Sequence, residues 1–291
     1  METSNNVSKL RRILKDILFP VEVVPFFQYV KGLKRLPSDR SMCVLAYTDG
    51  KENKPECTYI GGEKYVLVEN REVIDPLLEV LTKHFKNLRV RVINVDNEMF
   101  TVDFFNVAPD KRKNDYIAPA IRFVNSYNGK KPASASAAVY RVNKEGKEQF
   151  LASGSKHYEF KHHSDNGAVQ ITKISEQVEE MLKEFTTISE QVERLKKIEV
   201  SEIGKTMEQI VPDAKKYPKK AISTAIELVS YESMLLGSTP NLWLVYTALA
   251  QAVKQNDSKL DQMQREDADA IAWENTLNFA DGQIKPAKKK K

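Results

Sequence analysis

The sequence predicts an α+β protein, with a mainly antiparallel, β-rich N-terminal half and a helical C-terminal half that carries a long heptad-bearing helix. Before residue 170, apolar and polar residues alternate with period two, as in half-buried strands. Beyond it, eight apolar residues recur at spacings of three and four, so they lie on one seam of a helix. The charge changes at the same place: residues 1–170 contain 27 Lys and Arg against 21 Asp and Glu, and residues 171–284 contain 13 against 19.

This change divides the chain into predicted regions. They are an N-terminal helix with an irregular arm (1–40), a β-rich α+β domain (41–168), a helical region (169–280) and a disordered lysine-rich tail (281–291). The apolar stretches fall far short of the roughly 20 residues that span a bilayer, so we expect a cytoplasmic protein with no membrane contact. In that reducing compartment, Cys43 and Cys57 are expected to be two small core residues.

The first helix is expected to begin at Ser8 as N-cap and to end before Pro20, with its apolar residues at helical spacing. We interpret it as a docking arm. Strands are predicted at 41–48 and 58–69. A second helix follows, with Asp75 as the expected N-cap and Pro76 in the first helical position, where a missing N–H costs nothing.

Three antiparallel pairs are predicted after this helix. A hairpin spans 88–107, with its turn at Asp96 and Asn97. Strands 121–127 and 134–142 are joined through Asn128 and Gly129, which tolerate the positive φ of a tight turn. A further pair is expected across 144–147, between Gln149 and Phe160.

The heptad seam begins the helical half. Its residues are Ile171, Ile174, Val178, Met181, Phe185, Ile188, Val192 and Leu195. At about 1.5 Å per residue the seam is about 36 Å long, so it needs an antiparallel partner. That partner is either another helix of the chain or a second subunit, in a homo-oligomer formed through 171–198. More helices are predicted at 201–211, 214–236 and 240–255, the last capped by Ser238 or Thr239.

Catalytic chemistry has no distinctive motif in this chain, so we expect a non-enzymatic protein without a cofactor or a bound metal. His157, His162, His163 and Asp165 form a short cluster. In a strand His157 and His162 point to opposite faces, whereas a metal needs convergent ligands. We interpret the cluster as solvated or facing a polyanion, with a metal site as the alternative.

Cations and tyrosines recur along the predicted strands and loops. Single-strand binders combine such a cationic track with aromatic platforms for bases. The candidate nucleic-acid-binding residues are Arg89, Arg91, Lys111, Arg112, Lys113, Arg122, Tyr127, Lys130, Lys131, Tyr140, Arg141, Lys156 and Lys161. The alternative is an ordinary charged sheet face with half-buried tyrosines. The tail of lysines adds nonspecific attraction to phosphates.

Two stretches resemble the phage- and plasmid-encoded family described as phage/plasmid-like proteins of unknown function. They are IRFVNSYNGKKPASASAAVYRV (121–142) and TPNLWLVYTALAQAVKQ (239–255), with SDRSMCVLAYTD and KYVLVEN as looser matches. Where that family has Cys-Asn-Gly, this chain has Val142-Asn143-Lys144. The resemblance implies a mobile-element protein of the bacterial host cytoplasm that acts near DNA replication or recombination.

Two functions remain open at this point. The first is a phage- or plasmid-type nucleic-acid-binding protein, for single-stranded DNA binding or annealing, with the basic sheet as its surface. The alternative is a structural or protein-interaction factor, such as an assembly protein or a host-defence inhibitor, that uses the acidic helical half.

Overall fold

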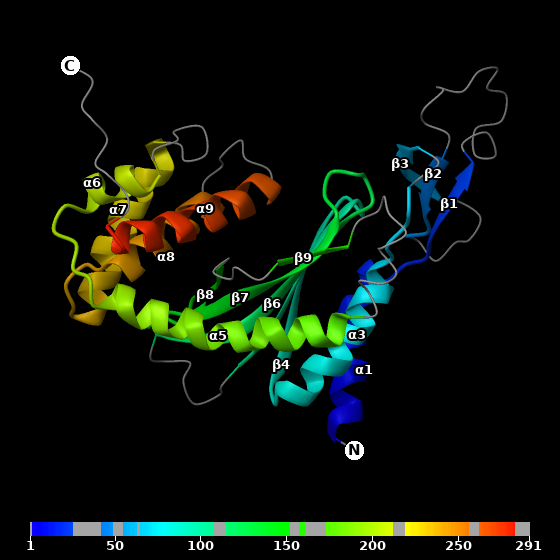
Figure 1. Ribbon diagram of the computed structural model, residues 1–291, viewed down its shortest axis with the longest axis horizontal. Helices are drawn as coiled ribbons and strands as arrows, with labels where there is room; N and C mark the ends of the chain where they lie inside the picture. Colours follow the sequence, from blue (N-terminus) through cyan, green and yellow to red (C-terminus); the bar gives the residue numbers. More distant parts are fainter. Residues whose placement is uncertain are drawn as a thin grey trace. The chain divides into compact units, whose positions relative to one another are not determined.

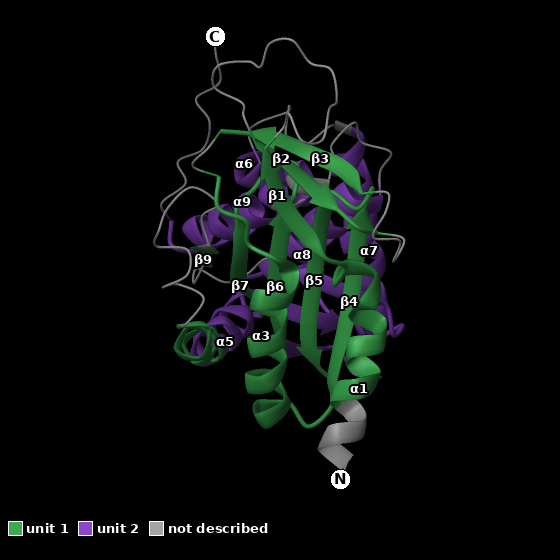
Figure 2. Ribbon diagram, turned by 90° about the vertical axis from the view of Figure 1, so that its right-hand side faces the viewer, with its two compact units in different colours: residues 1–107, 119–137, 155–182 green, residues 108–118, 138–154, 183–291 purple. Residues whose placement is uncertain are grey.

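The computed structural model confirms the predicted fold class, with antiparallel sheets in the N-terminal half and helices in the C-terminal half (Figure 1). It describes residues 2–25, 42–48, 55–62, 65–107, 115–151, 157–160, 173–211, 219–255 and 262–282. Two compact units interleave along the chain (Figure 2). Unit 1 comprises residues 1–107, 119–137 and 155–182, and unit 2 comprises 108–118, 138–154 and 183–291.

From residue 88 onward, all the described strands precede all the described helices. The helical elements are α1 (Glu2–Leu14), the 3-10 turn η1 (Lys15–Ile17), α3 (Asn70–His84), α5 (Ile174–Lys196), α6 (Ile203–Ile210), α7 (Lys219–Leu236), α8 (Leu242–Gln255) and α9 (Gln262–Ala280). The strands are β1 (Val21–Pro25), β2 (Met42–Ala46), β3 (Glu56–Gly61), β4 (Leu88–Val95), β5 (Met99–Asn106), β6 (Tyr116–Ser126), β7 (Ala133–Val142), β8 (Glu148–Leu151) and β9 (His157–Phe160).

Two antiparallel sheets hold these strands. The smaller has the order β1-β2-β3, and the larger has the order β4-β5-β6-β7-β8, with β9 also paired to β7. The predicted hairpin of β4 and β5 is confirmed, and its turn residues Asp96 and Asn97 have φ values of 51° and 56°. Gly129, with φ of 71°, follows β6 as the predicted turn requires.

Helices α1 and α3 of unit 1 lie side by side over β4, β5 and β6 (Figure 2). Both begin earlier than predicted. Helix α1 already starts at Glu2, and α3 starts at Asn70 behind the N-cap Glu69. Glu69 and Glu72 form a reciprocal capping box, so Pro76 lies inside the helix and not in its first turn. This capping box outweighs the proline signal, because it satisfies two backbone N–H groups at the helix start.

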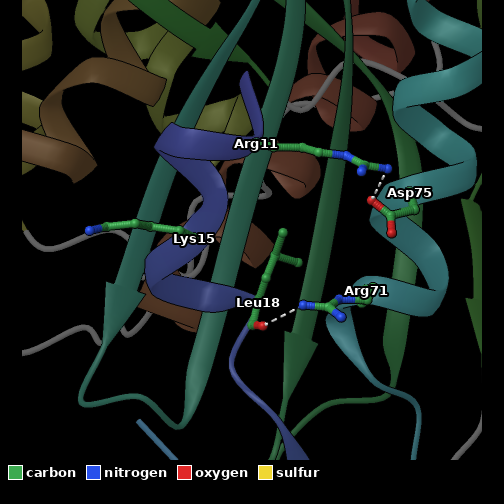
Figure 3. A pocket seen from close by; sticks show the side chains of 5 residues that line it. All are labelled: Arg11, Lys15, Leu18, Arg71 and Asp75. Atoms are coloured by element: carbon green, nitrogen blue, oxygen red, sulfur yellow. Dashed lines mark hydrogen bonds and ion pairs between the residues drawn. The ribbon is translucent and has the colours of Figure 1, made fainter. Parts of the chain in front are cut away.

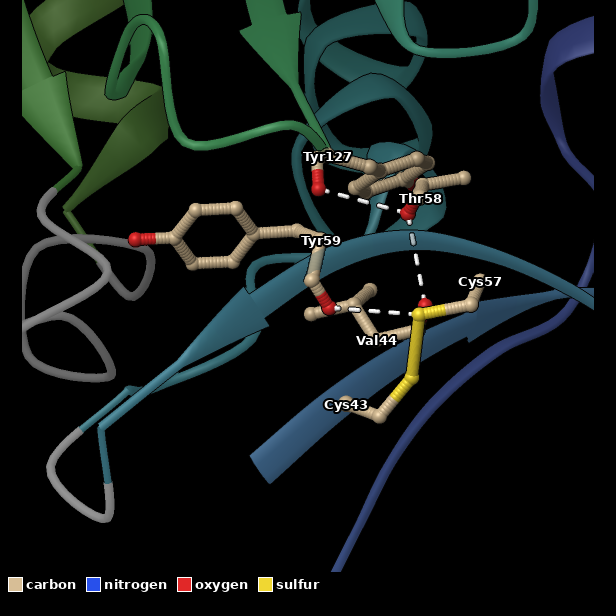
Figure 4. Close-up of a disulfide and its surroundings, with 6 residues drawn as sticks. All are labelled: Cys43, Val44, Cys57, Thr58, Tyr59 and Tyr127. Carbon is tan, nitrogen blue, oxygen red and sulfur yellow. Dashed lines mark hydrogen bonds between the residues drawn. A yellow bond between two sulfur atoms is a disulfide. The ribbon is translucent and has the colours of Figure 1, made fainter. Parts of the chain in front are cut away.

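A disulfide between Cys43 and Cys57 links β2 to β3, with 6.4 Å between the two Cα atoms (Figure 4). The two strands are paired, which places Cys57 opposite Leu45. The prediction of two reduced core cysteines differs from the structure. Adjacent antiparallel strands bring side chains close enough for such a bond.

Helix α8 is the central helix of unit 2, in contact with α7 and α9. Its residues from Leu242 to Ala250 are buried on all sides. The backbone N–H of Leu244 donates to Asn241 Oδ1 at 3.1 Å, so Asn241 caps the helix in place of the predicted Ser238 or Thr239.

The heptad seam lies on α5. Its described members are buried within the single chain except Phe185, which is half-buried, and Ile171 lies outside the described residues. The seam therefore packs intramolecularly, the first of the two alternatives. Among the helices of the described ranges, none combines the length and apolar character needed to cross a membrane.

Candidate functional site

Of the thirteen predicted nucleic-acid-binding residues, the structure describes the side chains of eight, and these eight do not form one surface. Five of them lie outside the described residues: Lys111, Arg112, Lys113, Lys156 and Lys161. Four are buried: Arg122, Tyr127, Tyr140 and Arg141. Arg89, Arg91 and Lys130 are exposed, and Lys131 is half-buried. The buried four are therefore not available for surface contacts.

Arg122 belongs to a charge ladder across three neighbouring strands of unit 1. Asp103 on β5 is in register with Arg91 on β4 and Arg122 on β6. Its carboxylate accepts from Arg122 Nε at 2.7 Å and from Arg91 Nη2 at 2.6 Å. Burial alone raises the pKa of Asp103, but the two guanidinium groups outweigh it and hold that pKa below its ordinary value. Both arginines are therefore paired with the Asp103 carboxylate inside the protein.

Tyr127 lies in the aromatic core of unit 1. Its ring makes edge-on contacts with Phe19 and Phe100, at centroid distances of 5.9 and 5.2 Å. Its hydroxyl accepts a hydrogen bond from the backbone N–H of Asn70 at 2.9 Å. Burial raises the pKa of this phenol. A ring held in this way has no face for a nucleic-acid base.

Arg141 lies at the centre of a buried cluster in unit 2, with no exposed surface. Its guanidinium donates to Asp115 at 2.8 Å, to Glu232 at 2.7 Å and to Gln149 at 3.0 Å. It also lies 5.8 Å from the centre of the Trp243 ring, within cation–π distance. Two carboxylates pair with this cation, so the guanidinium is held inside unit 2 and away from its surface.

Tyr140, the neighbour of Arg141 on β7, packs against Phe150 of β8 with ring centroids 5.1 Å apart. With 1% of its surface exposed, it offers no platform to a base. Both predicted tyrosines thus belong to cores and are more deeply buried than the half-buried tyrosines of the alternative interpretation.

Arg89 and Lys130, two of the exposed candidate residues, lie toward opposite ends of the sheet. Arg89 is in register with Phe105, which pairs with Ala120 in β6. Lys130 follows Ser126, at the other end of β6. Six residues of strand separate these two ends, or about 20 Å at roughly 3.3 Å per residue. No continuous basic track joins them among the described side chains.

A denser group of cations lies on α1, which the sequence-based interpretation treated only as a docking arm. Lys9, Arg11, Arg12 and Lys15 are all exposed. Leu10, Leu14 and Ile17 are buried on the opposite side. We call these four cations, three on α1 and Lys15 at the start of η1, the basic face of α1. The run KLRRILK carries this pattern in the sequence, and the helical spacing of its leucines and isoleucine fixes which side is solvated.

The basic face borders a pocket between α1 and α3, both in unit 1 (Figure 3). The pocket has a volume of about 330 Å³ and is lined by Arg11, Lys15, Leu18, Arg71 and Asp75. Arg11 extends across to Asp75, at 3.2 Å, and Arg71 donates to the Leu18 carbonyl at 3.3 Å. Three cations against one carboxylate leave the lining with a net positive charge.

The predicted histidine cluster falls mainly outside the described residues. His162, His163 and Asp165 are not described, and His157 is described only as a backbone position in β9. Within the described ranges, no three His, Cys, Asp or Glu side chains are grouped as metal ligands.

Comparison with known proteins gives one family. A family model described as "Domain of unknown function (DUF932)" matches residues 60–268. No curated protein and no solved structure matches the chain. The match includes the Asp103 ladder, the Arg141 cluster and the α3 side of the pocket, whereas α1 precedes it. Because it covers well over half of the 291 residues, the chain belongs to the uncharacterised DUF932 family.

Proposed function

We propose that this protein binds nucleic acid without catalysing a reaction, and that the basic face of α1 contacts the phosphates. The observation that carries the proposal is the exposure of four cations within residues 9–15, while Leu10, Leu14 and Ile17 are buried. Ile13 is exposed among these cations. Because the buried side of the helix already orders its backbone, only the side chains of the cations lose conformational freedom on binding.

The spacing of these cations suits a phosphate backbone. From Lys9 to Lys15 the helix rises about 9 Å, at about 1.5 Å per residue. Phosphates of one DNA strand follow one another at about 3.4 Å along the duplex axis, so the face spans two or three of them. Phosphate contacts fix position and carry no sequence information, so we expect binding without sequence preference.

The burial of Tyr127 and Tyr140 changes the earlier form of this hypothesis. Base stacking on these rings no longer supports a preference for single strands. The resemblance to phage- and plasmid-encoded proteins supports a mobile-element protein that acts on DNA in the bacterial cytoplasm. Strand preference is therefore an outcome of the experiment below.

The test is fluorescence anisotropy with labelled single- and double-stranded oligonucleotides, titrated with salt from about 50 to 200 mM. We expect binding at the low end that weakens steeply as salt rises. The double variant Lys9→Gln/Arg12→Gln removes two phosphate contacts. For a single strand, each contact contributes about −0.7 to the slope of log affinity against log salt. The slope of the variant should therefore be shallower than that of the wild type by about 1.4.

The matched control is Lys183→Gln/Lys197→Gln, which removes the same charge from two exposed residues in or just beyond α5. The control should keep the wild-type slope. Absence of binding by the wild type at 50 mM salt, or an equal effect of both double variants, would reject the proposal.

A further inference from the structure

We infer that the pocket between α1 and α3 binds a terminal phosphate monoester, the phosphate at the end of a nucleic-acid strand or of a free nucleotide. This inference rests on the proposed function and names the chemical group that the site prefers. Its parts are the Arg11 and Arg71 guanidinium groups, with Lys15 at the edge and Asp75 as the resident carboxylate.

The two arginines lie on different helices and face the same space (Figure 3). Arg11 extends from α1 toward α3, and Arg71 extends from α3 toward the end of α1. Lys15 points away from both, so it adds to the field at the pocket edge and not to a direct contact. A planar guanidinium offers two parallel N–H groups, which match two oxygens of one phosphate.

The Arg11 contact is readily exchanged. The Arg11 side chain is 57% exposed and that of Asp75 is 33% exposed. Ion pairs at such sites contribute little to stability, because water screens them. An incoming phosphate can therefore replace Asp75 as the partner of Arg11 at small cost.

Arg71 lies where a cation weakens the helix. It is the second residue of α3, near the positive end of the helix dipole, where carboxylates are favoured and cations are not. Its bond to the Leu18 carbonyl orients the guanidinium toward α1. The Glu69 carboxylate partly offsets this cost, because its charge and that of Arg71 attract each other. A guanidinium on the wall of a pocket that Arg11 also lines fits a role in binding an anion.

Size and charge select the monoester. A volume of about 330 Å³ is at the low end of small-molecule sites, enough for a phosphate and the sugar that carries it but not for a duplex. A terminal phosphate has a charge of −1.5 to −2 at about pH 7, and an internal phosphodiester has only one negative charge. The net positive lining therefore attracts a strand end more than the middle of a strand.

The test compares two oligonucleotides of one sequence, both labelled at the 3′ end, one with a 5′-phosphate and one with a 5′-hydroxyl. By anisotropy, the full-length protein is expected to bind the phosphorylated strand about tenfold more tightly, since each charge-assisted contact is stronger than a neutral one. Arg11→Gln should bring this ratio close to one. Arg71→Gln should do the same.

The matched control is Arg12→Gln, which removes the same charge one residue along α1 from outside the pocket lining. It should weaken both oligonucleotides and leave their ratio unchanged. Asp75→Asn removes the competing carboxylate, so it should increase the ratio. Arg11→Gln decides the matter if Arg71→Gln fails to fold, because Arg11 has no described partner other than Asp75.

The outcomes separate this inference from the proposed function. Equal wild-type affinities for the two strands would reject terminal-phosphate binding by the pocket. They would leave the proposal of nucleic-acid binding intact. If neither oligonucleotide binds, thermal melting with adenosine 5′-monophosphate and with adenosine becomes the readout. A rise in the melting temperature with the monophosphate alone, absent in Arg11→Gln, supports the pocket and rejects the proposed function; no rise rejects both.

Discussion

Arg122 and Arg141 are each buried with carboxylate partners. Asp103 meets Arg122 at 2.7 Å, and Asp115 and Glu232 meet Arg141 at 2.8 and 2.7 Å. An isolated buried guanidinium is very unfavourable, whereas one paired with a carboxylate is tolerated. Strand parity identifies residues on one face, but it does not identify a carboxylate on the next strand. For this reason the sequence alone placed both arginines on the surface.

Asp103→Asn is expected to destabilise the protein by about 3 kcal/mol at pH 7, because it leaves Arg122 buried without its counter-ion. The pKa of Asp103 is lowered on folding, so its contribution is complete above the ordinary carboxyl pKa. That contribution is lost as the pH falls below about 4 and through the lowered folded-state pKa.

Urea unfolding at pH 7 and at about pH 3 measures both effects. The difference between wild type and variant should be large at pH 7 and smaller in acid. Glu79→Gln is the control, because both side chains of its pair with Lys83 are exposed. This substitution should change the free energy of unfolding by less than about 0.5 kcal/mol. A difference that persists unchanged in acid would contradict the ionic role of Asp103.

At the scale of elements, local patterns predicted most of the fold. The hairpin of β4 and β5 and the helices α5, α6, α7 and α8 follow from spacing and turn residues within a few positions. The starts of α3 and α8 were missed because their caps, Glu69 and Asn241, competed with stronger nearby signals at Pro76 and Pro240.

The pocket was not predictable in the same way. Its two arginines are 60 residues apart in sequence, and only the packing of α1 beside α3 brings them together. The run of cations in α1 was visible, but nothing local showed that Arg71 faces it. A charge-dense amphipathic helix is thus a useful signal for one side of a site and not for the other.

The disulfide gives a prediction for β2 and β3. Cys43 and Cys57 should resist alkylation in the unfolded, unreduced protein and should each gain one label after reduction, as intact-mass spectrometry can show. A loop of about 15 residues closed by a disulfide is associated with about 3 kcal/mol of stability, so reduction should lower the urea midpoint. Two labels without reductant would restore the prediction of free thiols.

At the scale of the whole molecule, the described seam residues of α5 leave little apolar surface for a second subunit. Light scattering is therefore expected to give the mass of one 33.2 kDa chain. Val192→Asp should lower the melting temperature without changing the mass, because Val192 is fully buried within the chain. An oligomer that this substitution dissociates would instead make the seam an interface.

The interleaving of the two units also sets an order for synthesis. Residues 138–154 of unit 2 leave the ribosome long before the helices of the same unit. Arg141 and Glu232 are 91 residues apart, which corresponds to roughly 5 to 20 s of translation at about 5–20 residues per second. During that interval Arg141 cannot pair with Glu232, so its side chain reaches its final surroundings only after most of the chain has been made. On a ribosome stalled before residue 232, Arg141 would lack this partner.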